Sequence, residues 1–117
     1  MGLLPYLYSR QNVVPMLSIR KLTEIFGFNT ASVREFGLDR YSYVLFLYDP
    51  KKHIVGLQFT NDKKQQGIRS LVKNPRAGYM VHGGSFLSYC DPQKKYRGKS
   101  YPVKWDAGKA LMTFILK

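Results

Sequence analysis

The sequence predicts an α+β fold that is mainly β: an antiparallel, curved sheet of about five strands built from hairpins, with two or three short helices. Two observations predict it. Most apolar stretches are short, rich in aromatic and β-branched residues, and separated by Asn, Asp, Gly and Pro turn signals. In addition, a chain of 117 residues with 44% hydrophobic residues can bury a core without disulfides or metals.

Residues 1–15 are predicted to form an N-terminal arm, and residues 16–117 a single basic domain. Pro5 and Pro15 interrupt regular structure within the arm. We expect the arm either to be mobile or to lie as a strap along the domain surface.

Two short helices are expected after the arm. Residues 17–26 predict an amphipathic helix ended by Gly27, because one face would carry Leu17, Leu22, Ile25 and Phe26. Residues 30–36 predict a second helix that ends at Gly37. Its start is ambiguous, since Asn29 is a suitable N-cap whereas Ser32 and Glu35 have capping-box spacing.

A hairpin is predicted over residues 41–60, with strands at 41–48 and 53–60. Asp49 and Pro50 favour a type I turn between them. Alternation gives the first strand two largely apolar faces, one with Tyr41, Tyr43, Leu45 and Leu47 and the other with Ser42, Val44, Phe46 and Tyr48. One face would cover the helices. The other would stack bases, meet a second subunit, or also be buried within the chain.

The rest of the chain predicts, in order, a strand or helical turn at 67–73, a strand at 78–81, a helical turn capped by Ser85, an exposed loop at 91–100, and a second hairpin with strands at 101–106 and 109–116. The nearly continuous apolar run 111–116 indicates a strand buried on both faces, or on one face and in a dimer seam.

Positive charge dominates the composition, with 19 Lys and Arg against 7 Asp and Glu, a net charge of +12. Residues 1–50 contribute +1 of this charge and residues 51–117 contribute +11. Self-repulsion on that scale disfavours a compact chain and is tolerated more easily beside a polyanion. The charge therefore predicts a nucleic-acid partner; a solvated basic surface without a partner is the alternative.

The candidate phosphate-binding side chains lie in basic turns and loops of the second half of the chain. They are Lys51, Lys52, Lys63, Lys64, Arg69, Lys73, Arg76, Lys94, Lys95, Arg97, Lys99 and Lys104. Aromatic residues interleave with them, and Tyr96, Tyr101 and Trp105 are the candidate platforms for unpaired bases. Cations that follow the phosphates beside rings that stack on bases are typical of single-strand binders.

We expect no catalytic site, no cofactor and no metal site. The acidic residues are scattered, and no motif has the spacing of metal ligands. The two histidines, His53 and His82, leave open the alternative of a small metal-free ribonuclease or toxin. Cys90 has no base beside it in the sequence, which predicts a buried structural thiol.

The compartment is predicted from features of the same sequence. A single cysteine excludes an internal disulfide, and no apolar run reaches the roughly 18 residues of a membrane span. The apolar residues 1–8 have no basic leader of the kind that precedes a secretory signal. We therefore expect an intracellular protein, cytoplasmic or nucleoid-associated, without a membrane partner.

The arrangement resembles that of the Whirly and transcriptional-coactivator-type single-stranded-DNA-binding proteins. The resemblance rests on the aromatic hairpin 41–60, the basic loops, the strand that runs into Gly83-Gly84-Ser85-Phe86 and the apolar run 111–116, and it covers residues 38–117. It implies curved antiparallel sheets that hold unpaired DNA, and a homodimer. The last predicted element is a strand, whereas those folds commonly end a sheet with a helix.

Taken together, these features predict a non-enzymatic nucleic-acid-binding protein that acts in replication, recombination or transcription. Single-stranded DNA is the favoured partner, and a homodimer is expected. RNA binding, including a structural role beside the ribosome, is the alternative. A duplex reader is disfavoured, because the helix at 30–36 carries only Arg34 as a basic residue.

Overall fold

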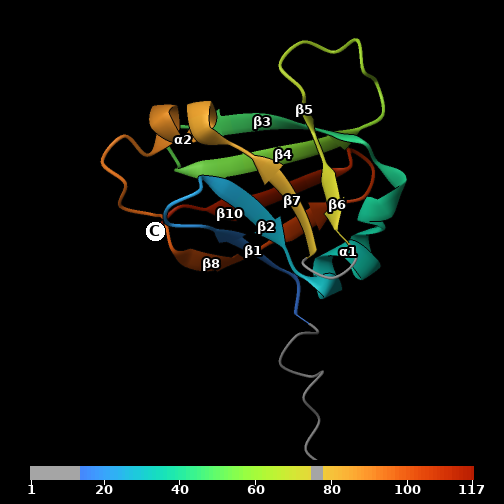
Figure 1. Cartoon of the computed structure of the whole chain (residues 1–117), viewed down its shortest axis with the longest axis horizontal. Coiled ribbons are helices and arrows are strands. Elements are labelled where there is room, and N and C mark those ends of the chain that lie inside the picture. The colour runs from blue at the N-terminus through green and yellow to red at the C-terminus, as the bar shows by residue number, and fades with distance from the viewer. Residues whose placement is uncertain (1–13, 75–77) are drawn as a thin grey trace, which may run out of the picture.

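Two antiparallel five-stranded sheets face each other in this computed structural model, which describes residues 14–74 and 78–117 (Figure 1). The first sheet has the strand order β6-β7-β2-β1-β8, and the second has the order β5-β3-β4-β10-β9. The strands are β1 (Met16–Ile19), β2 (Ile25–Phe28), β3 (Tyr43–Asp49), β4 (Ile54–Thr60), β5 (Arg69–Ser70), β6 (Val72–Asn74), β7 (Gly78–His82), β8 (Lys99–Pro102), β9 (Lys104–Asp106) and β10 (Leu111–Ile115). The helices are α1 (Thr30–Phe36), the 3-10 turn η2 (Leu38–Arg40) and α2 (Gly84–Cys90).

The predicted class, α+β and mainly β with antiparallel strands, is confirmed. The expectation of one sheet of about five strands is wrong, because the short segments at 16–28 and 69–74 also form strands and supply much of a second sheet. Apart from residues 14 and 15, the predicted N-terminal arm lies outside the described residues.

Each sheet continues into the other at both of its edges. Only Leu71 separates β5 from β6, and only Val103 separates β8 from β9, yet the members of each pair belong to different sheets. Leu71 is buried, and its backbone N–H donates to the Ser42 carbonyl at 2.9 Å. Bent strands of this kind form the corners where two packed sheets exchange chain. The chain therefore encloses one core between the two sheets.

Phenylalanines from both sheets meet in that core. Phe26 on β2 is fully buried, and its ring centroid lies 4.9 Å from that of Phe46 on β3. Phe28, two residues further along β2, packs edge-on against Phe59 of β4 at 5.4 Å. Such tilted aromatic pairs add to the burial of apolar area. The contacts fix which face of each strand points inward.

The helix predicted at residues 17–26 is wrong. This segment belongs to an antiparallel pair in which Leu17 lies opposite Phe28 and Ile19 opposite Phe26. The apolar spacing fits a helix, but residues 17 and 19, like 26 and 28, also alternate as in strands. Pairing with β7 and β8 decides between the two patterns, and it leaves Leu22 88% exposed in the turn.

The helix predicted at residues 30–36 is confirmed as α1, and the structure settles where it begins. The Asn29 carboxamide oxygen accepts the Ser32 backbone N–H at 3.0 Å, so Asn29 is the N-cap. Gly37 ends the helix in the left-handed conformation, at φ 64°. A side chain is disfavoured at that angle, which explains the glycine.

The hairpin predicted at residues 41–60 is confirmed as β3 and β4, with Tyr43 opposite Thr60 and Asp49 opposite Ile54. The Asp49 carboxylate accepts the backbone N–H groups of Lys51 and Lys52, at 3.0 and 3.3 Å, and so holds the turn. The face with Val44, Phe46 and Tyr48 packs into the core, and the face with Leu45 and Leu47 points outward.

The C-terminal half follows most of the predictions. Residues 69–74 are strand rather than helical turn, the strand at 78–81 is β7, and residues 84–90 form a two-turn helix in place of the expected single turn. The second hairpin is confirmed for β9 and β10, but β8 leaves it to pair with β1. Along β10 only alternate residues are buried and Ile115 is 48% exposed, so burial of both faces within this chain is wrong.

Candidate nucleic-acid interface

One end of the molecule is formed by turns that lie far apart in the sequence. The β1–β2 turn contacts the start of α2, because the Gly83 N–H donates to the Glu24 carbonyl at 3.1 Å. The loop 91–98 reaches β1 through a bond of 2.6 Å from the Gly98 N–H to the Ile19 carbonyl. The β3–β4 turn meets the C-terminal residues, since the Leu116 N–H donates to the His53 carbonyl at 2.9 Å. Figure 1 shows α2, the loop that follows it and the C-terminus on the left.

Exposed cations gather on this end, which we call the basic end. They are Arg20, Lys21, Lys51, Lys52, Lys94, Lys95, Lys99 and Lys117. Within residues 14–74 and 78–117, none of the eight forms an ion pair with an Asp or Glu side chain. Their charges are therefore free to act on a ligand. Like charges on neighbouring turns raise the local potential and attract polyanions.

Arg97 does not belong to this exposed set, and its burial disfavours the phosphate contact that the sequence predicts for it. Its side chain is only 5% exposed and lies 3.5 Å from both Asp91 and Glu24. Asp91 is itself buried and accepts the backbone N–H groups of Lys95 and Tyr96, at 2.8 and 3.1 Å. Arg97 and Asp91 therefore hold the loop 91–98 in shape. The cations of that loop extend outward from this anchor.

Two of the three predicted stacking rings already pack within the protein: Tyr101 is buried and Trp105 is half-buried. Tyr101 is 3% exposed, and its hydroxyl donates to the Tyr96 carbonyl at 2.8 Å. Burial raises the pKa of Tyr101 to about 12, so this donor stays protonated. Trp105 packs against the core and stacks on Phe36 at 4.9 Å with an interplanar angle of 10°. Tyr96 is half-buried, with the Lys99 ammonium 5.8 Å from its ring centroid.

The ring that the basic end does expose is Tyr89, which the sequence reasoning missed. Tyr89 is 67% exposed on α2, and its inner edge contacts Tyr48 at 5.7 Å with the rings nearly perpendicular. Burial, the largest cause, raises the pKa of Tyr48. A helical pattern in residues 84–90 was the available signal, because Leu87 and Cys90 form the buried face of that helix and Tyr89 lies off it.

Four of the other predicted cations, Lys63, Lys64, Lys73 and Lys104, lie away from the basic end. Lys63 and Lys64 follow β4, whereas Lys51 and Lys52 precede it; seven strand residues separate the pairs by about 20 Å. Lys73 donates to the Asp39 carbonyl at 2.7 Å, beside η2. Arg69 donates to the Ser85 hydroxyl at 3.0 Å and therefore lies beside the start of α2, next to the basic end. Lys104 lies on β9, and Arg76 is outside the described residues.

The structure also describes the residues on which a catalytic or metal site would depend. His53 and His82 are both exposed, and neither imidazole has a hydrogen bond or ion pair within the part of the chain that the structure describes. Cys90 is buried, which raises its pKa to about 11 and keeps it a thiol. The described residues contain no cluster of three or more His, Cys, Asp or Glu side chains able to hold a metal. No described helix has the length and apolar character needed to cross a membrane.

Comparison of the chain with protein-family models, with curated proteins and with solved structures gives no match in any of the three. The resemblance to the Whirly and coactivator-type proteins therefore stays a prediction that no comparison tests. Function has to be argued from the surface itself.

Proposed function

We propose that this protein binds single-stranded nucleic acid, with DNA favoured over RNA, at the basic end. The observation that supports the proposal is the position of an exposed ring, Tyr89, on a surface with eight exposed cations that pair with no acidic side chain of the described residues. Cations hold the phosphates and an exposed ring stacks an unpaired base, which requires no sequence-specific contact. In this proposal the protein has no catalytic activity and acts inside the cell, in replication, recombination or transcription.

The distribution of carboxylates supports the same end. Two of the three acidic side chains near the basic end, Asp91 and Glu24, face Arg97, and the third, Asp49, caps its own turn. The other four acidic side chains lie on other elements: Glu35 on α1, Asp39 on η2, Asp62 after β4 and Asp106 on β9. A polyanion therefore meets less repulsion at the basic end.

A salt series tests the proposal. Binding of fluorescently labelled single-stranded DNA, single-stranded RNA and duplex DNA of equal length is measured by anisotropy from low to moderate salt. If about six phosphates are neutralised, the logarithm of the affinity falls with the logarithm of salt at a slope near −4 for single strands. A flat salt response would defeat the proposal. Equal affinity for the duplex would remove the single-strand preference.

The same samples address the enzymatic alternative. Labelled RNA is incubated with the pure protein and analysed for cleavage. Cleavage that disappears in His53→Ala or His82→Ala would replace the binding proposal with a ribonuclease. In the binding titrations we expect the intrinsic fluorescence of Trp105 to stay unquenched, since Phe36 already covers its ring. Quenching comparable to that of an exposed indole would contradict this packing.

A further inference from the structure

A cavity of about 410 Å³ opens where β8 turns away from β10. The register of β9 and β10 pairs Leu111 with Asp106 and Thr113 with Lys104. Continued by two residues, it would place Ile115 opposite Pro102. Proline has no N–H to donate, so the ladder cannot extend there. Instead β8 pairs with β1, with Tyr101 opposite Leu17, and a gap remains between the two strands.

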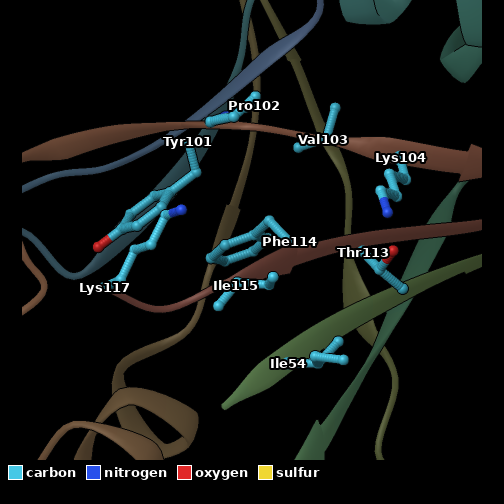
Figure 2. A pocket seen from close by; sticks show the side chains of 9 residues that line it. All are labelled: Ile54, Tyr101, Pro102, Val103, Lys104, Thr113, Phe114, Ile115 and Lys117. Atoms are coloured by element: carbon cyan, nitrogen blue, oxygen red, sulfur yellow. The ribbon is translucent and has the colours of Figure 1, made fainter. Parts of the chain in front are cut away.

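The walls of this cavity are mostly apolar. Phe114 forms its floor against Tyr101, with ring centroids 5.0 Å apart. Figure 2 shows Phe114 between the β8 chain on one side and Ile115 and Ile54 on the other. The volume lies within the range of about 300–1,000 Å³ that is usual for small-molecule sites. An apolar body of that size would bury both its own surface and the exposed part of Ile115.

The charged side chains of the lining are both lysines. Lys104 and Lys117 lie at opposite ends of the opening in Figure 2, and the lining contains no Asp or Glu side chain. A third ammonium, that of Lys99, donates to the main-chain oxygen of Lys117 at 3.3 Å. The Thr113 side chain adds a hydroxyl to the lining. A neutral ligand would form no charge interaction with the lysine ammonium groups. A ligand with an apolar body and an anionic group would pack against the apolar walls and also pair with an ammonium group.

We propose that this cavity binds a small organic anion: an aromatic or branched apolar body that lies over Phe114, with a carboxylate, sulfonate or phosphate group at Lys104. The inference does not rest on the proposed nucleic-acid function. Lys104 belongs to the cavity and not to the basic end, so a change at Lys104 separates the two sites.

Two dyes with the same rings test the proposal. One is 8-anilinonaphthalene-1-sulfonate, and the other is N-phenyl-1-naphthylamine, which lacks the sulfonate. The folded protein is expected to enhance the fluorescence of the sulfonate at a single saturable site and to bind the neutral amine more weakly. Lys104→Gln should weaken the binding of the sulfonate dye about threefold to fivefold and leave the affinity for the neutral amine unchanged, as expected for a partly exposed charge pair. Ile115→Asp should abolish the binding of both dyes, because it adds a carboxylate to the cavity wall.

The control variant is Lys109→Gln, which removes an exposed lysine of the same region that does not line the cavity. It should leave both dyes unaffected, and Lys51→Glu/Lys52→Glu should also keep sulfonate binding. Near-ultraviolet circular dichroism of each variant confirms native packing, because partly unfolded chains also bind these dyes. Equal affinity for the two dyes, an equal loss in Lys109→Gln, or no enhancement by the folded wild type would each overturn the proposal.

Discussion

Replacing Arg97 with Met distinguishes a cation that holds the fold from one that binds phosphate. The Arg97 side chain is 5% exposed and its partner Asp91 is 1% exposed. Removing one member of a buried ion pair costs about 3–5 kcal/mol, since it leaves the other charge buried. Asp91 would keep two backbone N–H donors, from Lys95 and Tyr96. These donors still stabilise the carboxylate, so we expect the lower value, about 3 kcal/mol, as the fall in the free energy of unfolding.

The assay is equilibrium unfolding in urea, with Lys95→Met as the matched control. Lys95 is the exposed cation two residues before Arg97, and its loss should change stability by less than about 0.5 kcal/mol. Two results together would refute the structural role: the free energy of unfolding of Arg97→Met falls by less than about 1 kcal/mol, and its affinity for nucleic acid falls by more than that of Lys95→Met. Arg97 would then be the phosphate ligand that the sequence alone predicts.

Four further predictions concern separate features. Tyr89→Ala should weaken single-strand binding by about 1–3 kcal/mol in the anisotropy assay, whereas Tyr89→Phe should bind nearly as well. Burial raises the pKa of the Cys90 thiol to about 11 and so favours the protonated form in the folded state; the free energy of unfolding in urea should therefore fall as the pH rises from about 9 to 11. Cys90→Ala should lack this part of the pH dependence. Gly83→Ala should lower the free energy of unfolding in urea by about 1–3 kcal/mol, because its Cβ would lie 2.4 Å from the Phe26 ring. If the expected homodimer forms through the outward face of β3, light scattering should give a mass of two chains for the wild type and of one chain for Leu47→Lys. A wild-type mass of one chain would make the dimer prediction wrong.

Local signals in the sequence were sufficient where short-range chemistry decides the structure. Gly37 ends α1 as predicted, and Asn29, one of the two candidate N-caps, begins it, because caps and left-handed ends depend on residues within one turn. The hairpin of β3 and β4 follows from alternation and from the Asp49 turn. At Leu17 and Ile19 the pattern fitted both helix and strand, and only pairing with distant β8 settled it.

The candidate site could be predicted only in part. Position in the sequence carries no information on where a turn lies in space, so Lys51 and Lys63 looked equivalent although β4 separates them. The contribution of Arg20 to the basic end required the pairing of β1 with β2 and β8. The partial burial of Trp105 follows from contacts with Phe36 and Phe59, which no local pattern shows.

The most direct test of the basic end compares two double charge reversals that change the net charge equally. Lys51→Glu/Lys52→Glu alters the basic end, and Lys63→Glu/Lys64→Glu alters the other end of β4. At about 0.1 M salt, where charges more than about 10 Å apart are largely screened, the first variant should bind a single-stranded oligonucleotide about tenfold more weakly than the second. Equal losses in the two variants would show that overall charge, and not a surface at the basic end, governs binding.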